Sequence, residues 1–279
     1  MVKRSLTALL IAMCAAIGPA SAAAQDAKGP TYELKLRDGS RIYGAIERQT
    51  EEQIEFRTIT GSLITARSAD VLELKEVKGE LVGGEFLPDD PNQTRLFFAP
   101  TGRSLPKGAV SFGTYEFIMP FVQVGVTDRF SIGGGTPLIF GFDESERPFW
   151  VTPKFQVVNG EKVSAAVGTL HLLASGHSAG IGYGVVTLSQ PAGSVSMGAG
   201  LAYEDGGGKS AVVMVGADRR VRRNLKLLTE NYVFKGGGLL SGGVRFIGDR
   251  LSADIGLVAP LGIEGFIVFP VANFVYVFQ

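Results

Sequence analysis

Residues 193–204 read GSVSMGAGLAYE, and this stretch decides the fold class. Apolar side chains occupy every second position from Val195 to Tyr203, and serine or glycine fills most positions between them. Successive side chains of a β-strand point to opposite faces, so this alternation predicts a strand with one apolar face. The other face carries small and weakly polar groups.

The same alternation recurs from residue 109 to the end of the chain, in stretches such as 149–157, 240–246 and 251–257. Turn signals rich in glycine, proline, asparagine and aspartate separate these stretches at short intervals. They divide the region into about twelve strands, most of them about 9–11 residues long, which is the length of a tilted membrane β-strand. The expected strands are roughly 109–118, 121–127, 130–139, 149–158, 161–174, 179–189, 193–204, 209–217, 225–234, 239–247, 251–260 and 268–278.

The distribution of charge over the two faces favours a membrane barrel over a soluble one. The less apolar face holds mostly glycine and serine with scattered charged residues, whereas a soluble strand would be dense in lysine and glutamate. Backbone polar groups in lipid must all be paired, which requires a closed sheet. The sequence therefore predicts an all-β chain in which an antiparallel membrane β-barrel of about twelve strands covers residues 109–279.

Three segments carry a resemblance to a known class of protein. Phe274, Tyr276 and Phe278 alternate on one face just before Gln279, and the segments 126–135 and 225–234 have the look of envelope-barrel hairpins. In these features the chain resembles bacterial outer-membrane β-barrel proteins of uncharacterised type, although Gln279 departs from their usual terminal aromatic residue. The resemblance implies the outer membrane of a Gram-negative cell, contact with outer-membrane lipid, and assembly-machinery recognition of the C-terminal strand.

The first residues have the pattern of a secretory signal. Lys3 and Arg4 precede an apolar run over residues 6–17, and small residues at 20–24 offer cleavage sites. We expect residues 1–24 to be removed as a signal peptide. The one cysteine, Cys14, lies in this segment, so the expected mature chain has neither a disulfide nor a thiolate metal site.

Residues 31–78 differ from the barrel region because they are charged and have short strands. The segment 36–44, with a turn at Asp38 and Gly39, resembles the start of SH3-like or Sm-like modules in bacterial envelope proteins. We expect a small five-stranded SH3-like barrel that contacts peptidoglycan or a periplasmic protein, or serves only as a spacer. Residues 79–108 are rich in glycine and proline and are predicted to be a linker, in which the run 94–100 is a plug, an edge strand or a lead-in to the barrel.

The composition excludes several classes of protein. Lys+Arg and Asp+Glu are both 27, so no basic excess is present to bind nucleic acid. Hydrophobic residues make up 45% of the chain, which is too many for a disordered protein. Glycine is abundant, with 38 residues, and most of them lie after residue 108. This excess is typical of tight turns and crowded strands.

Two groups of polar residues are candidates for function. The first group faces inward and is expected either to line a pore or to pair across a closed lumen: Lys154, Gln156, Glu230, Arg245, Ser252 and Asp254. The second is a basic cluster, expected on a periplasmic turn that contacts the envelope or is merely solvated: Arg219, Arg220, Arg222 and Arg223.

Catalytic motifs are weak. His171, Ser175, His177 and Ser178 fall within one short hairpin and form no recognisable nucleophile motif, and two histidines alone do not make a zinc site. We therefore expect no enzyme, no cofactor and no metal. The sequence indicates an outer-membrane β-barrel with a structural or narrow-transport role. The alternatives are a soluble or membrane-associated periplasmic barrel that binds lipid, and an outer-membrane hydrolase.

Overall fold

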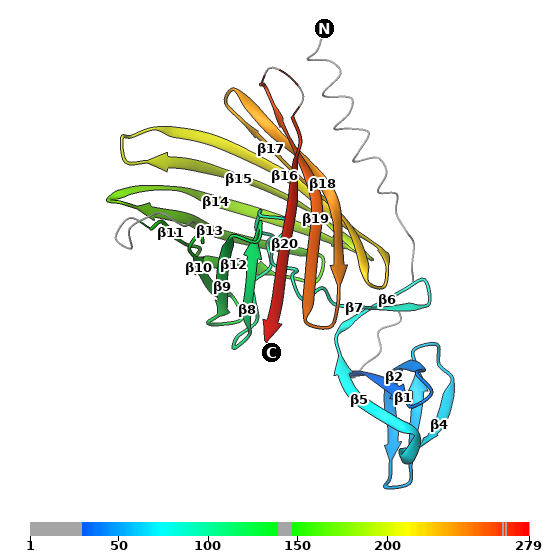
Figure 1. The fold of residues 1–279 in the computed structure, drawn as a ribbon. Helices are drawn as coiled ribbons and strands as arrows, with labels where there is room; N and C mark the ends of the chain where they lie inside the picture. Colours follow the sequence, from blue (N-terminus) through cyan, green and yellow to red (C-terminus); the bar gives the residue numbers. More distant parts are fainter. Residues whose placement is uncertain (1–29, 139–146, 264, 266, 279) are drawn as a thin grey trace. The chain divides into compact units, whose positions relative to one another are not determined.

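A computed structural model describes residues 30–138, 147–263, 265 and 267–278 (Figure 1). The expected signal peptide, residues 1–24, lies outside the described residues. The chain divides into two compact units, of which the smaller runs to Glu76 and adds Leu81–Gly84, and the larger comprises Val77–Glu80 and everything from Glu85 onward. Among the described residues the only helical element is the 3-10 turn η1, Ser68–Asp70, and no helix is long and apolar enough to cross a membrane.

The smaller unit is a five-stranded antiparallel sheet, as the alternation predicted. Its strands are β1 (Thr31–Leu36), β2 (Arg41–Gln49), β3 (Gln53–Thr58), β4 (Leu63–Arg67) and β5 (Val71–Val77), in the spatial order β4-β3-β2-β1-β5. Leu34 and Phe56 are fully buried at its centre. Gly39 adopts a φ of 90° in the β1–β2 turn, a conformation that glycine tolerates at no steric cost. The five strands are confirmed, while the SH3-like assignment stays a prediction.

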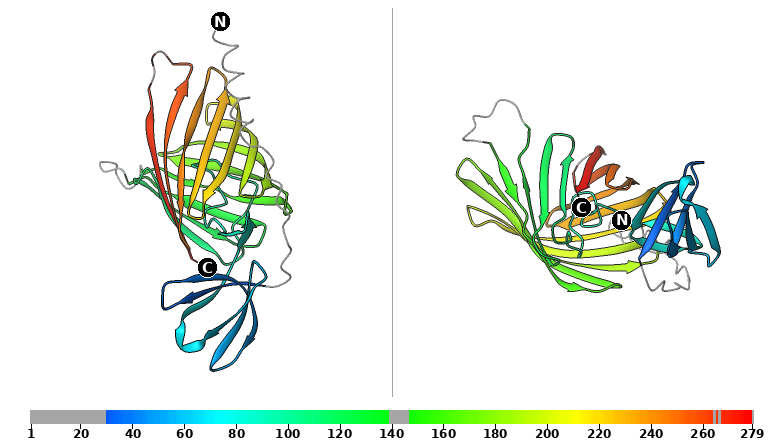
Figure 2. Two further views of the ribbon diagram at one scale, coloured as in Figure 1. Left: turned by 90° about the vertical axis from the view of Figure 1, so that its right-hand side faces the viewer. Right: turned by 90° about the horizontal axis from the view of Figure 1, so that it is seen from below.

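The larger unit is a closed antiparallel barrel (Figures 1 and 2). Each strand pairs with its sequence neighbours, and β20 pairs with β8 to close the sheet. β11 and β12 both lie between β10 and β13, so they are two halves of one barrel position, interrupted at Pro153 because proline has no N–H to donate. The barrel therefore has the predicted twelve strands. They are β8 (Val110–Tyr115), β9 (Met119–Gly125), β10 (Phe130–Gly135), β11 (Phe149–Val151) with β12 (Lys154–Asn159), β13 (Val163–Ala174), β14 (His177–Gln190), β15 (Gly193–Glu204), β16 (Lys209–Arg222), β17 (Leu225–Phe234), β18 (Gly237–Ile247), β19 (Leu251–Leu261) and β20 (Phe269–Phe278).

One predicted turn is wrong. A turn was expected over residues 218–224, but β16 continues to Arg222 and pairs with β17 along this length. Asp218 is buried in the lumen, where its carboxylate lies 2.8 Å from the ammonium of Lys226 on β17, so this segment takes part in the barrel interior. Consequently Arg219, Arg220 and Arg222 belong to a strand, and only Arg223 of the basic cluster lies in the turn.

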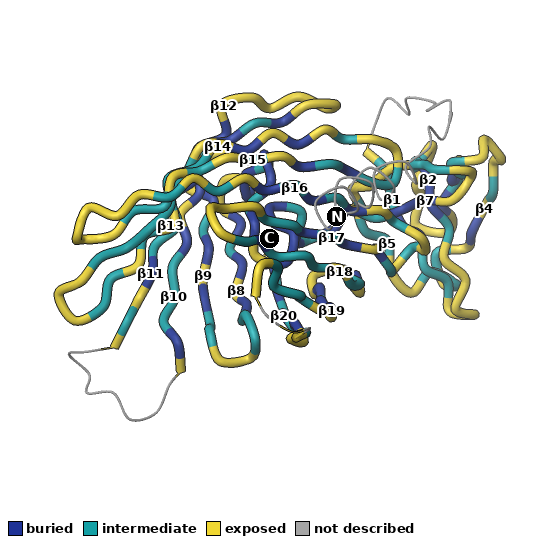
Figure 3. The backbone as a smooth tube through the Cα atoms, turned by 90° about the horizontal axis from the view of Figure 1, so that it is seen from above, coloured by how far each residue is buried: buried dark blue, intermediate teal, exposed yellow. Residues whose placement is uncertain are grey.

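The two faces of the barrel wall differ sharply in polarity. Outward residues such as Leu201 and Ile255 are apolar and 60% and 56% exposed. Inward residues such as Ser196, Arg245 and Asp254 are polar and buried, and Figure 3 shows the alternation of buried and exposed positions along the barrel strands. The barrel thus has an apolar exterior, and buried polar side chains line much of its interior.

The predicted linker at 79–108 is largely a folded part of the barrel unit. Its start is the hairpin of β6 (Gly79–Val82) and β7 (Glu85–Pro88). Residues 89–108, which we call the plug, then run inside the barrel, where Leu96 and Phe97 pack among apolar wall residues such as Met214 and Val271 (Figure 1, teal). An eight-stranded barrel is just filled by its own side chains. Twelve strands leave more room, and the plug occupies it.

Substitutions at Gly242 and Gly243, two adjacent residues of β18, measure how closely the barrel strands approach each other. A Cβ on Gly243 would collide with the backbone of Ile255 and Gly256 on β19, whereas a Cβ on Gly242 would meet only Leu228 O at 3.8 Å. We expect Gly243→Ala to lower the free energy of unfolding by about 1–3 kcal/mol, as overpacking does. Gly242→Ala should leave it unchanged or raise it. Urea titration of both variants measures the difference, and identical midpoints would contradict this packing.

Candidate functional site

Arg245 is the main anchor between the barrel wall and the plug. It lies on β18, is 1% exposed, and forms a bidentate ion pair with Asp254 on β19 at 2.6 and 2.9 Å. On the plug side its guanidinium donates to Asp90 at 3.0 Å and to the carbonyls of Asn92 and Leu96, each at 2.7 Å. A planar guanidinium with five donors suits such a junction.

Lys226 extends this charged junction on the neighbouring strand. Its Nζ lies 3.0 Å from Asp90 of the plug and 2.8 Å from Asp218 of β16. Burial alone would raise the pKa of Asp90, but Lys226 and Arg245 outweigh burial and hold it below its ordinary value. The stabilisation is therefore complete above the ordinary carboxyl range and is lost as the pH falls toward the lowered pKa.

The remaining wall contacts satisfy the backbone of the plug. Glu230 on β17 accepts the amides of Phe98 and Ala99, both at 3.0 Å, and the hydroxyl of Tyr232 at 2.7 Å. Four further wall side chains bind plug backbone groups: Lys154 to Thr94 O and Arg103 O, Gln156 to Ser104 N, Thr187 to Gly102 N, and Asn273 to Phe97 O. These anchors come from strands spread around the barrel, so the plug is held from several sides.

All six residues expected to face the lumen are buried in it. Lys154, Gln156, Glu230 and Arg245 bind the plug directly, and Asp254 orients Arg245. Ser252 is the exception, because its buried Oγ has no hydrogen-bond partner among the described residues. These contacts correspond to a closed lumen.

Several lumen residues were not predicted. Asp218 on β16 and Lys226 on β17 follow the same inward alternation, and a longer β16 would have identified Asp218 as inward. Asp90 and Arg95 could not have been identified from alternation, because they lie in a segment with no periodicity.

The basic cluster is divided between β16 and the turn that follows it. Arg220 donates to Pro88 O at 2.6 Å and to Arg223 O at 2.5 Å, so it faces the plug end of the lumen. Arg219 and Arg222 are exposed. A contact of these exposed arginines with the envelope stays a prediction.

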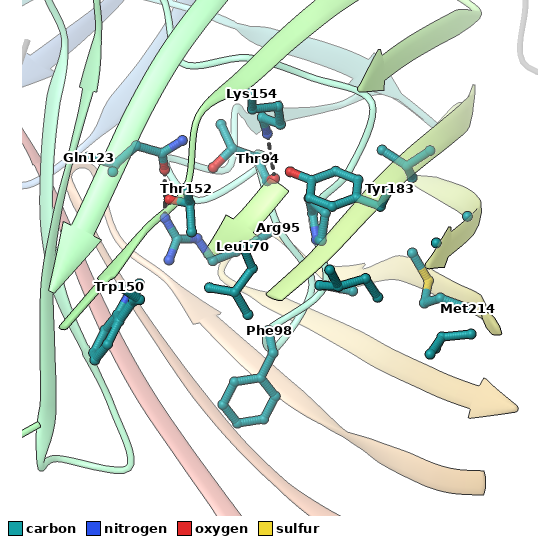
Figure 4. Close-up of a pocket in the computed structure, with 18 of the residues that line it drawn as sticks. Thr94, Arg95, Phe98, Gln123, Trp150, Thr152, Lys154, Leu170, Tyr183 and Met214 are labelled. Atoms are coloured by element: carbon teal, nitrogen blue, oxygen red, sulfur yellow. Dashed lines mark hydrogen bonds between the residues drawn. The ribbon is translucent and has the colours of Figure 1, made fainter. Parts of the chain in front are cut away.

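The lumen holds a cavity of about 410 Å³. Its lining is mostly aromatic and aliphatic, and Figure 4 shows the ends of Lys154 and Gln123 near Thr94, with the guanidinium of Arg95 beside Gln123. We call this space the lumen cavity. Its lining residues include Thr94, Arg95, Phe98, Tyr115, Met119, Phe121, Gln123, Trp150, Thr152, Lys154, Leu170, Leu172, Ile181, Tyr183, Val212, Met214 and Tyr232.

Arg95 of the plug lies in the wall of the lumen cavity. It donates to Gln123 Oε1 at 2.6 Å and to the hydroxyl of Tyr115. Its guanidinium carbon lies 4.1 Å from the ring centroid of Phe121, a cation–π geometry. Arg95 is therefore held by the neighbouring strands β8 and β9.

A second, smaller cavity of about 220 Å³ is lined by other plug residues, among them Asp89, Gln93 and Arg103, and by polar wall residues such as Glu161 and Arg220. Five plug residues line the lumen cavity instead: Thr94, Arg95, Phe98, Ala99 and Pro100. The two cavities thus meet different parts of the plug.

The hairpin with the two histidines has other contacts. His171 Nδ1 lies 2.8 Å from the hydroxyl of Tyr203, and Gly180 leaves the space that this hydroxyl occupies between the strands. Ser178 donates to Asp205 at 2.6 Å. Among the described residues no group of three or more His, Cys, Asp or Glu side chains could hold a metal ion.

Comparison with known proteins yields structural likeness only. No protein-family model and no curated protein matches the chain. Among solved structures it is similar to the KdgM porin in complex with disordered oligogalacturonate, with a TM-score of 0.49, 8% identity, and coverage of 61% of this chain and 99% of that chain. It is also similar to the NanC porin, with a TM-score of 0.41, 7% identity and coverage of 61% and 97%. A loop L8 deletion mutant of OmpT, an outer membrane protein of Vibrio cholerae, has a TM-score of 0.38, 12% identity and coverage of 89% and 97%. Identities this low assign no ligand or partner to this chain.

Removing the main anchor should destabilise the closed barrel. Arg245→Met leaves the buried carboxylates of Asp90 and Asp254 without this guanidinium, and breaking a buried ion pair costs about 3–5 kcal/mol. Arg219→Met is the matched control, because Arg219 is an exposed arginine on β16 of the same barrel wall. Urea unfolding followed by the fluorescence of Trp150, the one tryptophan of the chain, measures both. Equal midpoints for the two variants would show that Arg245 does not anchor the plug.

Proposed function

We propose that the chain is an outer-membrane β-barrel of a Gram-negative envelope with a narrow transport role, closed at rest by its plug. The observation that carries the proposal is the inverted polarity of the barrel wall. Apolar residues cover its outside, and charged, hydrogen-bonded residues fill its inside. This is the arrangement of a β-barrel that spans a bilayer.

The exterior argues against a barrel that works in water. A soluble protein rarely exposes a large continuous apolar surface. On this barrel, exposed apolar residues occur on strand after strand: Phe112, Val122, Ile132, Phe155, Val167, Val186, Met197, Leu201, Val213, Leu227, Phe246, Ile255, Leu257 and Phe278. A lipid environment removes this surface from water. A periplasmic lipid-binding barrel that is soluble would leave the same surface exposed to water.

The filling of the lumen supports a transport role over a purely structural one. The plug is fixed largely by ion pairs and hydrogen bonds, which water can replace, rather than by an uninterrupted apolar core. Cavities lie against different parts of the plug. Rearrangement of the plug would join them into a narrow path, mostly apolar along the lumen cavity and polar along the smaller one.

The chain ends fit the same proposal. The outward aromatic residues Phe274, Tyr276 and Phe278 on β20 support recognition by the barrel-assembly machinery and contact with outer-membrane lipid. With twelve strands, β8 begins and β20 ends on the same side of the barrel, the periplasmic side in bacterial outer-membrane proteins. We therefore place the five-stranded module in the periplasm, where peptidoglycan or a periplasmic protein is its expected partner.

Membrane integration has a direct test. Outer-membrane fractions run without boiling on a denaturing gel should show a faster-migrating band that shifts on boiling, because the closed sheet resists detergent. The protein should also stay in the membrane pellet after alkaline carbonate treatment. Release into the carbonate supernatant would contradict the proposed integral barrel and favour a soluble one.

Gating by the plug is tested in planar bilayers. We expect the wild-type protein to be closed most of the time and Arg245→Met to open more often, because one plug anchor is lost. Arg219→Met should behave as the wild type. If folded Arg245→Met conducts no more than the wild type, the result would contradict the transport role and favour a structural barrel.

A further inference from the structure

The lumen cavity has the size and polarity of a small-molecule site. Its volume of about 410 Å³ lies within the range of roughly 300–1,000 Å³ typical of ligand pockets. Aromatic and aliphatic side chains from both the plug and the wall line it, among them Phe98, Trp150, Ile181 and Met214. Such a lining binds an apolar body.

Arg95 and Lys154, which line the lumen cavity, differ from the other buried cations of the barrel interior in having no carboxylate partner within the described part of the chain. Arg245 and Lys226 each have a carboxylate within 3.0 Å. Arg95 and Lys154 have no carboxylate within 4.0 Å among the described residues. Their partners are the neutral groups Gln123, Tyr115 and backbone carbonyls.

Both cations retain donors for a ligand. The ammonium of Lys154 has three N–H groups and gives two of them to Thr94 O and Arg103 O. The guanidinium of Arg95 has five and gives two to Gln123 and Tyr115. Buried cations without a counter-charge are costly, and an anion beside them relieves that cost.

We propose that the lumen cavity binds a hydrophobic carboxylic acid of fatty-acid size, with its carboxylate at Arg95 and Lys154 and its hydrocarbon body among the aromatic residues. The inference rests on the proposed membrane barrel with its plug in place. It deepens that function by naming the ligand class.

Sugars and nucleotides fit the cavity poorly. They carry hydroxyl or phosphate groups along their whole length and need polar partners on every side. Here the charged and amide groups, on Arg95, Lys154 and Gln123, gather in one part of the cavity (Figure 4). A ligand with one polar end is complementary to this distribution.

The cavity is reachable from one end of the barrel. Leu170 and Leu172 line it and are 41% and 39% exposed, near the end of β13 and its turn into β14. This turn lies at the end of the barrel opposite the start of β8, by the alternation of strand direction. An acid can therefore enter without first displacing the plug.

Fluorescence titration with cis-parinaric acid, an 18-carbon polyene acid, tests the proposal. The full chain is placed in nanodiscs of zwitterionic lipid, empty nanodiscs provide the background, and the methyl ester of the acid is the neutral counterpart. We expect saturable binding of the acid and at least tenfold weaker binding of the ester. Equal affinities for acid and ester would overturn the proposal.

Three variants locate the site. Lys154→Met should weaken binding of the acid at least tenfold, whereas Lys209→Met, at an exposed lysine of β16, should leave it unchanged. Since Lys154 also binds the plug, Leu172→Trp provides a second test, because it fills the cavity from the wall and touches no plug anchor. Leu172→Trp should abolish binding. Binding that persists at wild-type strength in folded Leu172→Trp would overturn the proposal.

Failure of this inference is distinguishable from failure of the proposed function. Each sample is first run with and without boiling, which reports the folded barrel independently of any ligand. A heat-shifting barrel that binds neither acid nor ester contradicts only the ligand assignment. A protein without the heat shift contradicts the membrane barrel itself.

Discussion

Closure of a twelve-stranded sheet buries an inward polar face, and the groups on that face need hydrogen-bond or ionic partners. The chain supplies many of these partners from its own residues 89–108. Arg245 is central, because it ties Asp254 of the wall to Asp90 and to the backbone of the plug. The plug's amides in turn give Glu230, Gln156 and Thr187 their hydrogen bonds. Wall and plug are thus mutually dependent, since neither satisfies its buried polar groups alone.

The sequence predicted the barrel well because its signal is local. Period-two alternation needs only neighbouring residues, and glycine-rich turns mark where each strand ends, so the strand number and most boundaries follow from the chain itself. The site was predicted in part for the same reason. Inward polar residues such as Gln156 and Glu230 are identified by their strand positions, without knowledge of what they bind.

The plug was predicted only as one of three possibilities for residues 94–100, and its contacts were not predicted because its partners are distant in sequence. Asp90 meets Arg245 at a separation of 155 residues, and its own neighbourhood of proline, aspartate and asparagine has the composition of a loop. The extension of β16 was missed for a different reason, because Asp218 and the following arginines have turn-like composition. In the structure these residues pair with β17 through the backbone, and Asp218 also forms an ion pair with Lys226.

The central claim is that residues 89–108 form a fixed part of the barrel rather than a mobile linker. Hydrogen exchange of the folded protein tests it most directly, because the amides of Phe98, Ala99, Gly102 and Ser104 donate to wall side chains. These amides should exchange as slowly as those of β17–β19. Exchange of residues 96–104 as fast as in an exposed loop, in a folded barrel, would contradict the account.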